Sequence, residues 1–224
     1  MHNEDLNKIN RSLQSEIIDQ VNDLADDGQA AAFKEDVFTQ IMIDYLLDFG
    51  ALDGGEVVHF ERKTGYGNVK VNGYYFDEDE GRLDIYVSAL NYMDDVIALP
   101  KTEVRKFLER ASRLYTMALK NYHLEMEPAH DDYSMLETIS SNQSEIYKKR
   151  IVLFSNYVFD FNPDDFSIEG FSVDLWDLKR FMKNVTSIKG HESIEVDFTL
   201  FDSRVKCLAI DHFNDTYETF RAPI

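Results

Sequence analysis

The side chains best suited to bind a metal ion lie in residues 69–88, where two short segments alternate between polar and apolar positions. In the second segment Asp84 shares one face with Tyr86 and Ser88, because successive residues of a strand point to opposite sides. Asn72 takes a polar position in the first segment. Since hard cations such as Mg²⁺ prefer carboxylate oxygens, Asp84 is the leading metal ligand and the leading catalytic candidate.

Two further carboxylates could complete such a site. Glu35 lies on a preceding helical segment, and Asp77 opens the acidic turn between the two alternating segments. Bound Mg²⁺ would activate water for phosphodiester hydrolysis, which gives the hypothesis of a nuclease that uses Asp84 and Glu35 with Asp77 as a third ligand. The alternative for the acidic turn is a solvated loop that keeps the hairpin tip soluble.

A strand, a tight turn and a second strand, placed between two helices, resemble the nuclease core of restriction endonucleases. Such a core needs an Asp on one strand, and an acidic residue and a Lys two positions apart on the next. Here Asn72 fills the first slot, Tyr86 stands two positions after Asp84, and the second strand carries no lysine. The catalytic set of Asp84, Asn72 and Glu35 is therefore incomplete, and the alternative is that the polar residues form the wetter face of an ordinary strand.

Basic residues are concentrated in residues 101–120, a segment that contains six basic and two acidic side chains. Lys106, Arg110 and Arg113 are spaced i, i+4 and i+7, so they share one side of the predicted helix. This basic stripe predicts a local contact with a nucleic-acid backbone. Ion pairs with acidic groups of the same molecule are the alternative.

Composition limits the remaining choices. The chain has 224 residues and a formal net charge of −19, which excludes a broad basic footprint for nucleic acid or for a membrane surface. A hydrophobic fraction of 44% and an aromatic fraction of 13% are enough for a packed core. The single cysteine, Cys207, excludes an intrachain disulfide and is expected to be buried in a strand. With a polar N-terminus and no long apolar stretch, we expect a cytoplasmic protein without a membrane partner.

Hydrophobic periodicity predicts the order of elements. We expect helices over residues 4–26 and 31–49, after Pro100 with Thr102 as its cap, from about 133 to Tyr147, and after Asp177 as a cap. We expect strands over residues 57–60, 69–76, 83–88, 151–154, 171–175, 194–198 and 205–210. This order predicts an α/β (α+β) fold with a mixed central sheet flanked by helices. We place an N-terminal helix at residues 1–28 and one nuclease-like α/β domain at residues 29–224.

The hairpin of residues 69–88 resembles the N-terminal region of the abortive phage infection (AIPR-type) proteins, which carry a similar strand, acidic turn and strand. Three later segments resemble that family in the same order: residues 151–155 (Ile-Val-Leu-Phe-Ser), 173–181 (with Trp-Asp-Leu-Lys-Arg) and 194–198. The resemblance covers about residues 30 to 210. It implies a bacterial anti-phage defence protein with a restriction-endonuclease-like fold, and a family whose members are much longer than this chain.

We therefore expect the N-terminal domain of an abortive-infection protein that is nuclease-like in fold and catalytically degenerate. It would act as a nucleic-acid-sensing or partner-binding module, with nucleic acid, a protein partner or a second copy as its ligand, and Mg²⁺ as cofactor only if it is active. The alternatives are the active Mg²⁺-dependent nuclease and an acidic interaction scaffold or DNA mimic, which the net charge alone supports.

Overall fold

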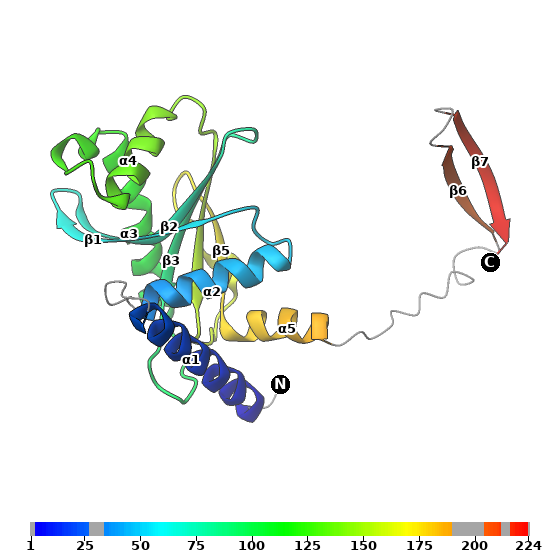
Figure 1. The fold of residues 1–224 in the computed structure, drawn as a ribbon, viewed down its shortest axis with the longest axis horizontal. Coiled ribbons are helices and arrows are strands. Elements are labelled where there is room, and N and C mark those ends of the chain that lie inside the picture. The colour runs from blue at the N-terminus through cyan, green and yellow to red at the C-terminus, as the bar shows by residue number, and fades with distance from the viewer. Residues whose placement is uncertain (1–2, 27–33, 190–203, 212–215, 224) are drawn as a thin grey trace. The chain divides into compact units, whose positions relative to one another are not determined.

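The computed structural model describes residues 3–26, 34–189, 204–211 and 216–223. Contacts divide the chain into two compact units, Met1–Thr186 and Ser187–Ile224. Helix α1 (Asn3–Asp26) belongs to the first unit, and the expected domain boundary near residue 28 stays a prediction. The apolar face of α1 shares a hydrophobic cluster with α2 (Lys34–Asp48). Figure 1 shows the two helices next to each other.

A five-stranded mixed sheet forms the centre of the first unit. Its strands follow one another in space as β1 (Glu56–Thr64), β2 (Gly67–Asp77), β3 (Arg82–Ala89), β4 (Lys148–Ser155) and β5 (Ser172–Trp176). The first three strands are antiparallel, whereas β4 and β5 run parallel to β3. This sheet with its flanking helices confirms the predicted α/β fold, and the β2–β3 pairing confirms the predicted hairpin.

Helices cover both faces of the sheet. On one face α3 (Lys101–Ala118) and α4 (Asp131–Ser141) pack on Leu83, Ile85 and Val87 of β3. On the other face α1, α2 and α5 (Leu178–Lys189) pack on Tyr86 of β3 and on residues of β4. Because both faces are covered, Asp84, Tyr86 and Ser88 are each 0% exposed. The alternative of a wetter strand face is therefore wrong.

The helix ends correct two predictions. Helix α3 begins directly after Pro100 and no side chain caps it, so Thr102 is not its cap. Helix α4 ends at Ser141 instead of Tyr147. At this end the Asn142 side chain donates to the Thr138 carbonyl at 2.9 Å. The predicted cap of α5 is confirmed, since Asp177 Oδ1 accepts the Arg180 amide at 2.8 Å. In the described ranges, none of the helices combines the length and the apolar composition that a membrane crossing requires.

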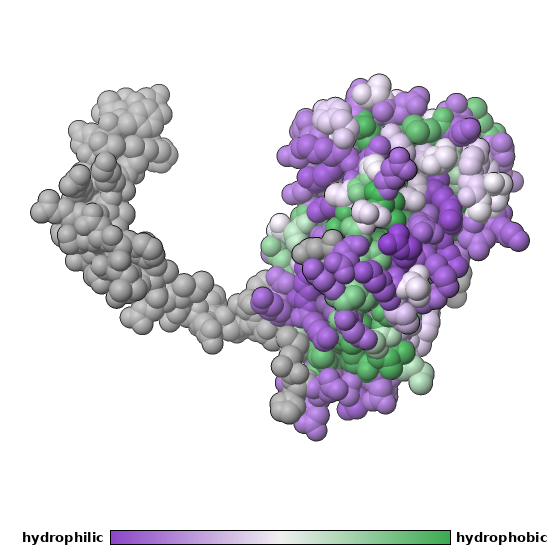
Figure 2. Space-filling view, turned by 180° about the vertical axis from the view of Figure 1, so that it is seen from behind, coloured by the Kyte–Doolittle hydropathy of each residue, from purple (hydrophilic) through white to green (hydrophobic). Residues whose placement is uncertain are grey.

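Two short 3₁₀ helices, Tyr122–Glu125 and Pro163–Asp165, complete the first unit. Figure 2 shows one face of this unit, on which hydrophilic residues surround smaller hydrophobic patches. The second unit contains an antiparallel pair, β6 (Arg204–Asp211) and β7 (Thr216–Pro223). Strand β6 confirms the prediction for residues 205–210. The predicted strand 194–198 and the predicted burial of Cys207 lie outside what the structure describes.

Gly81 ends the acidic turn, and its backbone conformation and close contacts predict that a larger residue there destabilises the fold. Its φ is +56°, and an added Cβ would lie 2.4 Å from the Glu145 carbonyl oxygen. We expect Gly81→Ala to lower the free energy of unfolding by about 2–3 kcal/mol, because backbone strain and a backbone clash add. Gly50 is the matched control, since its φ is +65° but no atom lies within 4 Å of an added Cβ. Urea unfolding of both variants checks this, and equal losses would contradict the contribution of the clash.

Candidate functional site

A pocket of about 490 Å³ opens where the parallel strands β3 and β4 end. Leu90 follows β3, Tyr157 follows β4, and both line this pocket, which we call the strand-end pocket. Ligands of open α/β sheets bind outside the carboxyl ends of the strands, in pockets of about 300–1,000 Å³. Position and size therefore make it the candidate functional site.

An ion pair forms the polar side of this pocket. Lys70 Nζ on β2 lies 2.7 Å from Glu35 Oε1 in the first turn of α2, and 4.0 Å from Glu61 Oε2 on β1. The side chains of Lys70 and Glu35 are only 11% and 15% exposed. Because a charge is costly to bury alone, the contact between these two opposite charges offsets part of the cost of burying them at the pocket wall.

Asn72 connects this ion pair to the sheet. Its Nδ2 donates to Glu35 Oε2 at 3.2 Å, and its Oδ1 accepts the Ser88 amide at 2.9 Å. The Ser88 hydroxyl lies 2.7 Å from that of Thr39 on α2. The structure thus brings together two predicted site residues, Glu35 and Asn72. Asn72 therefore links α2, through Glu35, to β3, through Ser88.

His59 joins the pocket from β1. The pairing of β1 with β2 shifts register between Val57 and Phe60, which marks a bulge around His59. Bulges redirect side chains and are frequent beside functional sites. His59 Nδ1 lies 3.0 Å from Asp36 Oδ1, so α2 contributes two consecutive acidic residues here.

Three aromatic side chains, Tyr92, Phe107 and Tyr157, line the same pocket. Lys70 Nζ lies 5.5 Å from the centre of the Phe107 ring, within range of a cation–π contact. Tyr92 is 62% exposed although it is a large aromatic residue. Partial burial raises the pKa of the Tyr92 phenol, and the charge of Glu35 raises it further. Tyr92 therefore lines the same pocket as the ion pair and offers much of its surface to solvent.

Buried amides hold the loop that carries Tyr92. Asn156 Oδ1 accepts the Asn91 amide at 2.6 Å, and Asn156 Nδ2 donates to the Asn91 carbonyl at 2.8 Å and to Asn10 Oδ1 at 2.9 Å. Asn10 on α1 also donates to the Met93 carbonyl at 2.9 Å. The backbone on both sides of Tyr92 is thereby fixed by side chains that are almost fully buried.

Asp84 lies in a separate network at the other end of β3. Arg150 donates to both of its oxygens, from Nε at 2.9 Å and from Nη2 at 2.5 Å, and Arg82 Nε lies 3.4 Å away. Ser88, which binds Asn72, is four residues further along β3, or about 13 Å at the rise of a strand. Asp84 therefore does not join Glu35 and Asn72.

Asp77 lies near Asp84, but its side chain stabilises the acidic turn. Its Oδ1 accepts the Glu80 amide at 2.9 Å, and its Oδ2 lies 3.8 Å from Arg82 Nη2. Within the described ranges, no group of three or more His, Cys, Asp or Glu side chains could hold a metal ion. The convergence of Asp84, Asp77 and Glu35 is not found there, and a metal-binding role for Asp84 and Asp77 stays a prediction.

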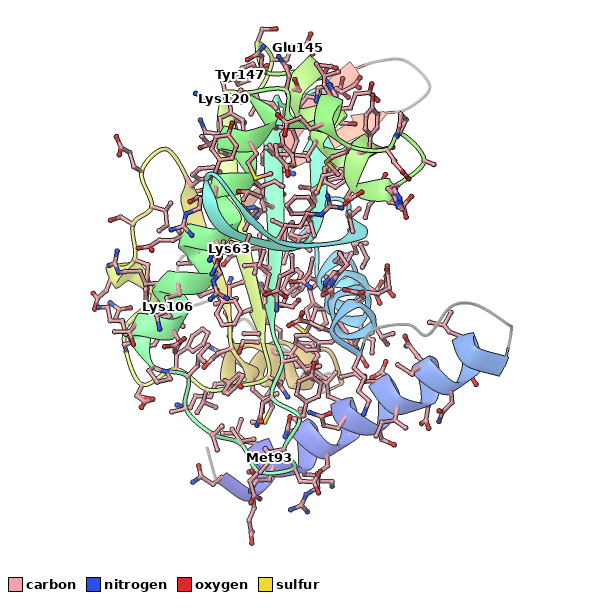
Figure 3. All side chains as sticks on the ribbon, turned by 90° about the vertical axis from the view of Figure 1, so that its left-hand side faces the viewer. Lys63, Met93, Lys106, Lys120, Glu145 and Tyr147 are labelled. Carbon is pink, nitrogen blue, oxygen red and sulfur yellow. The ribbon has the colours of Figure 1, made fainter. Side chains whose placement is uncertain are left out.

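The basic stripe lies on α3, across the sheet from Asp84 and Asn72. Lys106 Nζ pairs with Glu103 Oε1 at 2.6 Å, and Arg113 Nη1 donates to the Asn68 carbonyl at 2.9 Å. Figure 3 shows Lys106 on the ribbon of α3. Part of the stripe therefore pairs within the molecule, and nucleic-acid contact by Lys106, Arg110 and Arg113 stays a prediction.

Sequence reasoning missed the residues that surround Glu35 in the pocket. It looked for a lysine on the second strand of the hairpin, whereas Lys70 lies on the first strand, two positions before Asn72. That spacing was the available signal. No sequence pattern pointed to His59, Tyr92 or Tyr157, because tertiary contacts alone bring them to the pocket.

Comparison with known proteins identifies the family. Residues 38–183 match the N-terminal domain of abortive infection phage resistance proteins. No curated protein and no solved structure matches the chain. The matched segment runs from α2 into α5 and includes Asn72, Lys70 and Asp84. Since this match covers more than half of the chain, the protein belongs to the family of abortive infection phage resistance proteins, as a carrier of their N-terminal domain.

Proposed function

We propose that this domain is a nuclease-like module that no longer catalyses cleavage and instead senses nucleic acid during a cytoplasmic phage-resistance response. Membership of the abortive infection family supports the biological setting. The order of α2, antiparallel β1 to β3, α3 and parallel β4 supports a restriction-endonuclease-like core.

The state of Asp84 carries the proposal. A Mg²⁺ ligand must offer an open carboxylate oxygen, but both oxygens of Asp84 accept hydrogen bonds from Arg150 and the side chain is 0% exposed. The neutral amide of Asn72 stands where such a core would carry an Asp, and it is engaged by Glu35 and Ser88. These groups stabilise the fold where a nuclease would hold its metal.

The strand-end pocket supplies the sensing role in this proposal. It lies beside the Glu35–Lys70 pair and presents aromatic side chains to solvent. Charged groups that recognise polar edges and aromatic rings that stack on bases are the usual means of binding single strands. The pocket therefore supports nucleic acid as the ligand more directly than the basic stripe does.

A cleavage and binding experiment tests both parts. We expect the purified chain to leave single- and double-stranded DNA and RNA intact in the presence of Mg²⁺, and to bind at least one of them in fluorescence anisotropy. Robust Mg²⁺-dependent cutting that Glu35→Gln or Asp84→Asn abolishes, with folding verified by circular dichroism, would show an active nuclease. Absence of binding to every nucleic acid would overturn the sensing role.

A further inference from the structure

We propose that the strand-end pocket receives one unpaired nucleobase, so that the domain distinguishes single-stranded from double-stranded nucleic acid. This inference rests on the proposed function and specifies its ligand. It is carried by an exposed aromatic residue on a fixed loop beside a buried ion pair.

The aromatic side chains provide the stacking surface. Tyr92 is 62% exposed at the pocket, and Phe107 and Tyr157 line it from α3 and from the segment after β4. Every base has a flat face, so stacking on aromatic rings binds bases with little dependence on sequence. A duplex cannot offer that face, because its bases are already stacked on one another.

The ion pair provides polar partners for the edge of a base. Lys70 donates hydrogen bonds, whereas the carboxylate of Glu61, whose side chain is 52% exposed, accepts them. An unpaired base presents donors and acceptors side by side on its Watson–Crick edge. In a duplex the same edge is occupied by the opposite base. The pocket therefore suits an unpaired base, either in a single strand or flipped out of a duplex.

The charge of the protein favours a base over the phosphate backbone as the main contact. The net charge is −19, and Lys106 of the basic stripe is paired with Glu103. Few phosphates can therefore be neutralised, and each such contact on a single strand contributes about −0.7 to the slope of log K against log salt. Base insertion predicts a slope shallower than about −2.

The loop that carries Tyr92 is organised before any ligand binds. Asn156 and Asn10 fix the backbone at Asn91 and Met93 through buried hydrogen bonds. A backbone segment that is already held in place loses little conformational freedom on binding, which favours affinity. Buried polar bonds that support an exposed aromatic ring are what a stacking platform requires.

The test compares oligonucleotides and two tyrosine variants of the full chain. We expect fluorescein-labelled 12-nucleotide single strands to bind more tightly than the matching duplex in anisotropy. Tyr92→Ala should weaken single-strand binding about 5- to 150-fold, which is the effect of about 1–3 kcal/mol of stacking per base. Tyr147→Ala is the matched control, because Tyr147 is 69% exposed and does not line the pocket. Figure 3 shows Tyr147 and Met93, which follows Tyr92 in the chain, at opposite ends of the view.

The possible results separate this inference from the proposed function. Single-strand affinity that falls in Tyr92→Ala but not in Tyr147→Ala supports base insertion. Equal affinity for single strand and duplex, or no effect of Tyr92→Ala, overturns base insertion and leaves nucleic-acid sensing in place. If the unmodified chain binds no nucleic acid at all, both the inference and the proposed function fail.

Discussion

Replacing Asp84 with alanine is expected to lower the free energy of unfolding by about 3–5 kcal/mol, the usual cost of removing one partner of a buried ion pair. Asp84 is 0% exposed and Arg150 donates to both of its oxygens. Without the carboxylate, the Arg150 guanidinium, whose side chain is 21% exposed, would lose its charged partner inside the protein. Urea unfolding followed by circular dichroism measures the difference.

Two comparisons establish the cause of this loss. Lys148→Met removes an exposed pair with Glu80 at 3.1 Å, and we expect a change below about 1 kcal/mol. The double variant Asp84→Leu with Arg150→Met replaces both charges by apolar groups and should regain much of the stability. A small effect of Asp84→Ala would instead indicate a carboxylate that the fold does not need, which would reopen its assignment as a metal ligand.

Asn156→Ala is expected to lower the free energy of unfolding by about 2–4 kcal/mol, because it leaves several buried polar groups without partners. The Asn156 side chain makes three hydrogen bonds, two with the Asn91 backbone and one with Asn10. Each of these three asparagines is 3% exposed or less. The loop that positions Tyr92 would lose its support, so single-strand affinity should fall together with stability.

Asn184→Ala is the control for this variant. Its side chain donates to the Arg180 carbonyl at 2.8 Å in an exposed position, where water can replace the bond, and we expect a change within about 0.5 kcal/mol. Thermal unfolding and anisotropy are measured on the same samples. Full affinity of a destabilised but folded Asn156→Ala protein would show that the pocket does not depend on the fixed loop.

Together these two variants separate the two ends of β3. The network around Asp84, at the start of the strand, contributes to stability, whereas the network around Asn156 supports the pocket after its end. The proposed function therefore predicts that binding depends on the pocket and not on Asp84.

Local patterns in the sequence predicted the fold well. Alternation in residues 69–88 predicted the β2–β3 hairpin, and spacings of three and four residues predicted α1, α2 and α3, because each pattern reflects the faces that an element buries. The family was likewise recognised from short segments in the right order. Predictions about caps and helix ends were less successful. The predicted cap Thr102 and the predicted end of the fourth helix at Tyr147 were wrong, because the ends of a helix depend on the segments that flank it.

Candidate residues were found by type, but their grouping could not be read from the sequence. The register pairs Asp84 with Tyr75, whereas Asn72 accepts the amide of Ser88, four residues further along β3, and lies far from Asp84. No local rule specifies that offset, because it depends on the turn and on the contacts of α2 with the sheet.

The sequence by itself determined the alternating strands, the helical faces, the net charge of −19 and the family of the chain. These properties depend on neighbours along the chain or on composition. The tertiary structure alone decided that Asp84 binds Arg150, that Lys70 binds Glu35, and that Tyr92 lines the same pocket as Lys70 and Glu35. Such contacts join residues that are far apart in the chain, and folding brings them together only when helices close on both faces of the sheet.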